Sequence, residues 1–105
     1  MRRVFLVLLA FCLAGAGEAA PKPMSKNERA YTITLICVAI SANENTGDIR
    51  SIDAARKMAK TLGYKNERLS RDMLTMASVV GVQLRDEPAT VDRNRAICRQ
   101  LGLVG

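Results

Sequence analysis

The sequence predicts an all-α protein, a small bundle of about four helices joined by one disulfide. Apolar residues recur at spacings of three and four in four successive segments, which is the period of an amphipathic helix. Short stretches of polar residues, glycine and proline separate these segments, as in turns between helices. One cysteine lies in the first segment and one in the last, so a bond between them would join the two ends of the bundle.

Residues 1–19 are expected to be a signal peptide. They begin with a positive charge, continue with the apolar stretch 4–14, and offer small residues for cleavage after Ala16 or Ala19. The apolar stretch is shorter than the roughly 20 residues of a membrane-spanning helix, which disfavours a retained anchor. Cys12 would leave with this segment. Because the chain has no Asn-x-Ser/Thr acceptor for glycosylation, we expect export to a bacterial periplasm rather than passage through a eukaryotic secretory route.

The two remaining cysteines, Cys37 and Cys98, are predicted to form a disulfide. An even cysteine count in an exported chain indicates a disulfide, and these residues are the only pair. The bond would close a loop of about 60 residues and stabilise the fold by about 4 kcal/mol. Two free buried thiols are the alternative. A zinc site is disfavoured because the sequence has no histidine and no C-x-x-C pair.

The first helix is expected over Ser25–Ala42, after an extended tether at residues 20–25, in a single helical domain of residues 26–105. Ser25 and Glu28 fit a capping box, in which each side chain accepts from the other residue's main-chain N–H. The β-branched residues that follow would also suit a strand, but the cap and the length favour a helix. Apolar residues occupy most of its sides, which is typical of a central helix.

The same periodicity predicts three further helices, over residues 49–62, 67–84 and 88–101. Asp48 and Asn66 are candidate caps, and Gly63 is placed for a left-handed helix end. Gly81 indicates either a close helix crossing or an early end of the third helix. Pro88 suits a first helical turn, and the short connections favour antiparallel neighbours.

Composition argues against an enzyme. The absence of histidine removes the commonest general base and metal ligand. The serines have no G-x-S-x-G context, and no glycine-rich phosphate loop is present. The adjacent acids Asp86 and Glu87 more often serve a helix start than acid–base chemistry. We therefore expect no catalytic residue, no metal and no cofactor.

The net charge of +6 has several possible explanations. A solvated basic surface is the simplest, followed by an acidic protein partner, and then by anionic lipid or a cell-wall polymer. Nucleic acid is disfavoured because Tyr31 and Tyr64 are the only aromatic residues left after the signal peptide, too few for a stacking platform.

Two polar connections are the candidate partner-binding segments. A loop presented on a rigid helical scaffold suits entry into another protein's cleft, although ordinary turns are the simpler interpretation. The candidate residues are Asn43, Glu44, Asn45, Asp48, Arg85, Asp86 and Glu87.

A set of scattered positions resembles a known family. They are Tyr31, Leu35-Ile36-Cys37, Asp48, Asp53-Ala54-Ala55 and Ile97-Cys98. Between Tyr31 and Leu101 the chain resembles the small periplasmic immunity proteins that neutralise the amidase effectors of type VI secretion systems. The resemblance implies an all-helical, disulfide-linked protein, often a homodimer, that blocks a peptidoglycan-cleaving enzyme by inserting a loop into its active site. No inhibitory loop motif matches residue by residue, and the basic charge departs from the family's pattern.

Two other functions stay open on the sequence. Periplasmic acid-stress chaperones are also small, helical and two-cysteine proteins, although their cysteines lie closer together than these. Protonation of the carboxylates would raise the positive charge further and open such a fold. A small helical binding module of unknown role is the third interpretation.

Overall fold

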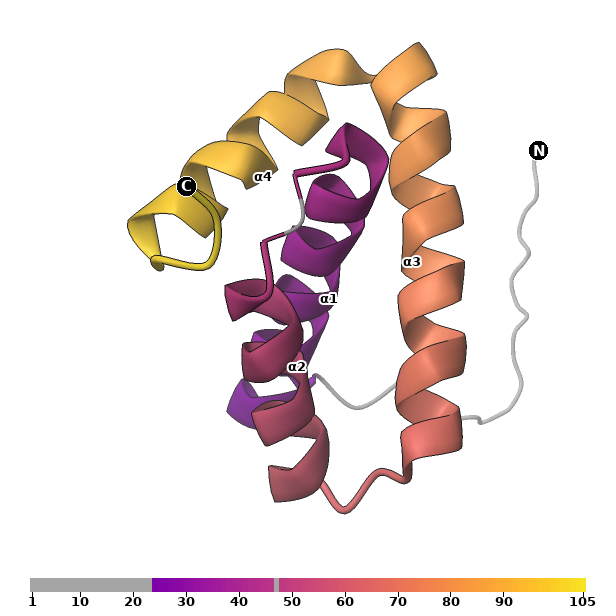
Figure 1. The fold of residues 1–105 in the computed structure, drawn as a ribbon, viewed down its shortest axis with the longest axis vertical. Coiled ribbons are helices and arrows are strands. Elements are labelled where there is room, and N and C mark those ends of the chain that lie inside the picture. Colours follow the sequence, from indigo (N-terminus) through magenta and orange to yellow (C-terminus); the bar gives the residue numbers. More distant parts are fainter. Residues whose placement is uncertain (1–23, 47) are drawn as a thin grey trace, which may run out of the picture.

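A computed structural model describes residues 24–46 and 48–105, which form four helices and no strand (Figure 1). The helices are α1 (Lys26–Glu44), α2 (Arg50–Thr61), α3 (Asn66–Asp86) and α4 (Pro88–Gln100). This confirms the predicted all-α class. The signal peptide expected at residues 1–19, and the tether up to residue 23, lie outside the described residues. Over the part that is described, no helix combines the length and the apolar character needed to cross a membrane.

The helix ends follow the sequence signals in part. Ser25 Oγ accepts from the Glu28 N–H at 3.1 Å and Glu28 Oε1 accepts from the Ser25 N–H at 3.0 Å, so the predicted capping box is present. Gly63 has a φ of 74° after α2, as expected for a left-handed helix end. The prediction that Asn66 caps the third helix was wrong. Asn66 is the first residue of α3, and the N-cap residue is Lys65, whose side chain makes no capping bond.

Helix α1 lies at the centre and contacts the other three helices, whereas α2 and α3 barely touch each other (Figure 1). On one side, a group of buried residues joins α1 to α2 and α3; it consists of Tyr31, Leu35, Val38, Ala55, Ala59 and Leu69. On another side, a second group joins α1 to α3 and α4; it consists of Cys37, Ala39, Ile40, Val80, Val91 and Cys98. Because α1 is covered from several directions, its apolar residues do not form one narrow stripe.

The crossing of α1 and α3 is close at Gly81. The Asn43 amide nitrogen of α1 donates to the Ala39 carbonyl at 2.9 Å and to the Ala77 carbonyl of α3 at 3.0 Å. A Cβ atom at Gly81 would lie 3.3 Å from Asn43 Oδ1. Since α3 continues to Asp86, Gly81 marks a close crossing and not an early helix end.

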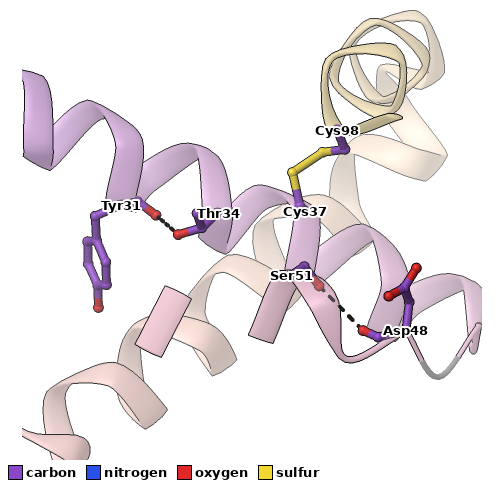
Figure 2. Close-up of a disulfide and its surroundings, with 6 residues drawn as sticks. All are labelled: Tyr31, Thr34, Cys37, Asp48, Ser51 and Cys98. Atoms are coloured by element: carbon purple, nitrogen blue, oxygen red, sulfur yellow. Dashed lines mark hydrogen bonds between the residues drawn. A yellow bond between two sulfur atoms is a disulfide. The ribbon is translucent and has the colours of Figure 1, made fainter. Parts of the chain in front are cut away.

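The predicted disulfide between Cys37 and Cys98 is confirmed and joins α1 to α4 (Figure 2). The two Cα atoms are 5.7 Å apart, and both cysteines are fully buried in the second apolar group. The bond fixes α4 across α1, after a sharp change of direction at Glu87, the single residue between α3 and α4 (Figure 1).

Candidate partner-binding site

The connection between α1 and α2 starts later than expected. Asn43 and Glu44 belong to the last turn of α1, and the helix ends at Asn45, whose φ of 57° is left-handed. The described residues of the connection are therefore Asn45, Thr46, Asp48 and Ile49. Asn43 holds α1 against α3 through its amide, so its side chain is engaged inside the fold.

Asp48 is fixed by the start of α2. Its carboxylate accepts from the main-chain N–H of Arg50 at 3.0 Å, from Arg50 Nε at 3.0 Å and from Arg50 Nη2 at 2.6 Å. The bonds from the Arg50 side chain, then that from its main chain, lower the pKa of Asp48 to about 2. The buried Ser51 hydroxyl also donates to the Asp48 carbonyl at 3.5 Å (Figure 2). Asp48 thus braces the connection, as the predicted cap would, although the helix N-cap itself is Ile49.

Glu44 fixes the other end of the connection. Its carboxylate accepts from Nη2 of Arg95 on α4, and Arg95 Nη1 also donates to Asp92 at 2.6 Å. These bonds to Glu44 and then to Asp92 raise the pKa of the Arg95 guanidinium. Arg95 therefore links the end of α1 to α4, the same two helices that the disulfide joins.

Ile49 lies between Asp48 and Arg50, at the α2 end of the connection. The residue is 64% exposed, and it lies beside the polar bonds that join Asp48 to Arg50. The apolar periodicity placed Ile49 at the start of a predicted helix and gave no indication of its exposure. A large apolar residue directly after a polar turn is the signal that could have indicated it.

A pocket of about 620 Å³ lies beside the connection, between the end of α1, the start of α2, α4 and the last residues of the described chain. Glu44 and Asp48 line it, together with the arginines Arg50, Arg95 and Arg99. None of these three arginines was among the predicted site residues. Arg95 and Arg99 are four residues apart on α4, a spacing that places both on one helix face and could have been noticed.

The second predicted segment, Arg85 to Glu87, does not contribute to this pocket. It forms the junction of α3 and α4, where Arg85 Nε donates to Asp86 at 3.3 Å in an exposed ion pair. Glu87 is the residue shared by the two helix ends. The structure therefore keeps the two predicted segments as separate features and assembles the pocket from only one of them.

Comparison of the chain with family models, with curated proteins and with solved structures gives no match. Among the described residues, no group of three or more His, Cys, Asp or Glu side chains is placed to hold a metal ion.

Proposed function

We propose that this chain is an exported immunity protein that binds and inhibits a peptidoglycan-cleaving amidase effector by inserting the α1–α2 connection into the enzyme's cleft. The observation that carries the proposal is Ile49, an exposed apolar residue on a connection braced at both ends by Glu44–Arg95 and Asp48–Arg50. The class of enzyme comes from the resemblance of residues 31–101 to amidase immunity proteins.

A braced connection lowers the cost of binding. Ordering a flexible loop at an interface costs conformational entropy, whereas Glu44 and Asp48 are already held by hydrogen bonds from Arg95 and Arg50 in the free protein. Burial of an exposed isoleucine in a partner contributes about 1.5–3 kcal/mol. Ile49 would thus be the apolar anchor and the surrounding charges its polar rim.

The disulfide supports the exported location in the proposal. Cys37 and Cys98 hold together the two helices that frame the pocket, which suits an oxidising compartment. Fractionation of the producing cells should recover the chain from the periplasm with its N-terminus at residue 17 or 20. Recovery in the cytoplasm with residues 1–19 attached would contradict export.

The test of inhibition uses co-expression with a periplasm-targeted amidase effector, starting with any hydrolase encoded beside this gene. We expect a complex and protection from lysis. Ile49→Ser should weaken the complex at least tenfold, because the buried isoleucine is lost. Leu74→Ser is the matched control, since Leu74 is 72% exposed and belongs to α3, outside the connection. The proposal would be rejected if the chain formed no complex and gave no protection, or if both variants weakened the complex equally.

The resemblance also implies a homodimer, which is a separate part of the proposal. Light scattering of the purified chain and of its complex measures the number of copies directly. A single copy of the chain in both preparations would contradict the predicted homodimer without bearing on the proposed inhibition.

A further inference from the structure

We propose that the end of the bundle around the α2–α3 connection is a docking surface for an anionic lipid bilayer, which the chain binds through the lipid headgroups. The surface, which we call the basic end, consists of residues 24–35 and 56–73. These are the start of α1, the end of α2 and the start of α3, which lie together at the lower end of the molecule in Figure 1. The inference does not rest on the proposed amidase function.

The excess positive charge of the described chain is confined to the basic end. This end carries eight exposed cations against three carboxylates, whereas the rest of residues 24–46 and 48–105 carries five arginines against six side-chain carboxylates. The eight cations are Lys26, Arg29, Arg56, Lys57, Lys60, Lys65, Arg68 and Arg71. A molecule with such a separation of charge turns its positive end toward an anionic surface during encounter.

Most cations of the basic end have no partner of opposite charge among the described residues. Of the eight, Arg56 forms an ion pair with Asp53 at 3.5 Å and Arg68 forms one with Asp72 at 3.4 Å. Outside the basic end, by contrast, most of the arginines are paired; these are Arg50, Arg85 and Arg95. Six cations of the basic end are therefore left for an external anion.

Tyr64 fixes the centre of the basic end. Its ring meets the buried Tyr31 ring edge-on, with centroids 5.2 Å apart, and the Arg68 guanidinium lies 3.6 Å from its own centroid. Arg68 Nε and the Tyr31 hydroxyl both donate to Asp72, at 3.4 and 2.8 Å. The α2–α3 connection is thus packed against the core, and the cations on its two sides keep their spacing.

Two hollows flank Tyr64, and cations line both. The larger, of about 390 Å³, has three cations and one carboxylate in its wall; they are Lys65, Arg68, Arg71 and Glu67. The smaller, of about 230 Å³, has two cations and no carboxylate; the cations are Arg56 and Lys60. Each hollow suits the phosphate of one headgroup, which accepts several charge-assisted hydrogen bonds.

The arrangement of the cations favours a bilayer over a protein partner. The cations come from three helices and surround the outermost turn of the bundle, so a protein would need a broad acidic concavity to reach them together (Figure 1). Lipids move laterally and bring separate phosphates to separate cations. Met24, at 45%, is the one strongly exposed large apolar residue of the basic end, so docking involves headgroups and not insertion.

Docking through the basic end would leave the candidate site accessible. Ile49 and the α2–α3 connection lie at opposite ends of α2, which has 12 residues and is therefore about 18 Å long. The α1–α2 connection would point away from the lipid.

Vesicle sedimentation tests the docking. Residues 20–105, which retain all four helices and the disulfide, are mixed with vesicles of phosphatidylglycerol and phosphatidylcholine in equal parts, or of phosphatidylcholine alone. We expect binding only to the anionic vesicles at about 0.1 M salt, and release at about 1 M salt, which screens charge. No preference for the anionic vesicles, or binding that withstands the salt, would overturn the proposal.

Two double variants with the same loss of charge locate the surface. Lys60→Gln with Arg71→Gln removes one cation from each hollow, and neither residue takes part in an ion pair within the described chain. Arg85→Gln with Arg93→Gln removes two exposed charges outside the basic end. Because each cation near an anionic bilayer strengthens binding about fivefold, the first pair should weaken binding at least tenfold and the second less than twofold. Equal weakening would assign the binding to net charge and overturn the docking surface. Thermal melts check that both variants remain folded.

Single tryptophans report the orientation on the vesicle. The natural chain has none, so Asn66→Trp at the basic end and Ile49→Trp on the α1–α2 connection each introduce one reporter. Energy transfer to dansyl-labelled headgroups should be stronger from position 66. Stronger transfer from position 49 would overturn docking through the basic end.

Polyglutamate separates a bilayer from an acidic protein partner. We expect it to displace the chain from the anionic vesicles only when its carboxylates greatly outnumber the lipid phosphates. Displacement at equal numbers would overturn the bilayer and favour an acidic protein. Amidase inhibition without vesicle binding would reject the docking surface and keep the proposed function, whereas vesicle binding without inhibition would do the reverse.

Discussion

The Asn43 side chain of α1 lies against the main chain of α3 at Gly81, with only 3.3 Å between Asn43 Oδ1 and the position of a Cβ atom at Gly81. The same amide donates to the Ala77 carbonyl, so the contact is polar as well as close. Side-chain size at position 81 therefore determines how closely α1 and α3 approach at the end of the bundle that carries the candidate site.

Gly81→Ala should show a thermodynamic coupling to Asn43. Alanine is favoured over glycine inside a helix by about 1 kcal/mol, but here its methyl group would press on an amide held by two hydrogen bonds. We expect no net stabilisation in the natural chain and about 1 kcal/mol of stabilisation in an Asn43→Ala background. Urea unfolding of the four proteins measures both effects. An equal effect in the two backgrounds would contradict the contact.

Removal of the disulfide should lower the free energy of unfolding by about 4 kcal/mol, because Cys37 and Cys98 are 61 residues apart in the sequence and their bond limits the unfolded chain. Denaturant unfolding of a Cys37→Ser, Cys98→Ser double variant measures the loss. The mass of the untreated chain should be lower than that of the reduced chain by its two thiol hydrogens. Reaction of both thiols with an alkylating agent before reduction would contradict the bond.

Stability should fall in acid as Asp48 is protonated. Because Arg50 lowers the pKa of Asp48 from 3.8 to about 2, the stabilising contribution is present above pH 4 and is lost as the pH falls through about 2. Glu28 acts in the same direction, since hydrogen bonds from Ser25 lower its pKa. Asp48→Asn should be less stable at neutral pH and should lose less stability in acid. Thermal melts at a series of pH values test this, and parallel curves for the two proteins would contradict it.

The acid-stress chaperone interpretation is tested on the same samples. It predicts that the chain suppresses the aggregation of client proteins at about pH 2 to 3, where Asp48 is being protonated. Inactivity in that range would remove the chaperone interpretation.

Tyr31 should ionise only in strong alkali. Burial, followed by the 2.8 Å hydrogen bond that its hydroxyl donates to Asp72, raises its pKa from 10.0 to about 12. The unfolded chain releases this proton first, so the associated stability is present below pH 10 and is lost as the pH rises to about 12. Tyrosinate absorbance in a Tyr64→Phe background follows Tyr31 alone, because the described chain has no third tyrosine.

Asp72→Asn is the control for this titration. The midpoint should fall because the carboxylate charge is gone, but it should stay above 10 because burial is the larger cause. A midpoint near 10 in the folded natural chain would contradict the buried hydrogen bond.

The helices and their order could be predicted because their signals are local. The capping box of Ser25 and Glu28 and the spacing of apolar residues both act within a few positions of the chain. The Cys37–Cys98 bond could be predicted by counting, once Cys12 was assigned to the signal peptide. The candidate site could be predicted only in part, since Asp48 lines the pocket and Asn43 does not.

By itself, the sequence determined an all-α chain of four helices with a disulfide between the first and the last. Only the tertiary structure decided which polar side chains from distant helices meet. Asn43 and Glu44 find their partners 34 and 51 residues away, and Arg99 joins Ser41 in one pocket only because α4 folds back across α1. Such pairings depend on how the helices cross in space, and hydrophobic spacing along the chain does not encode where polar groups from distant helices meet.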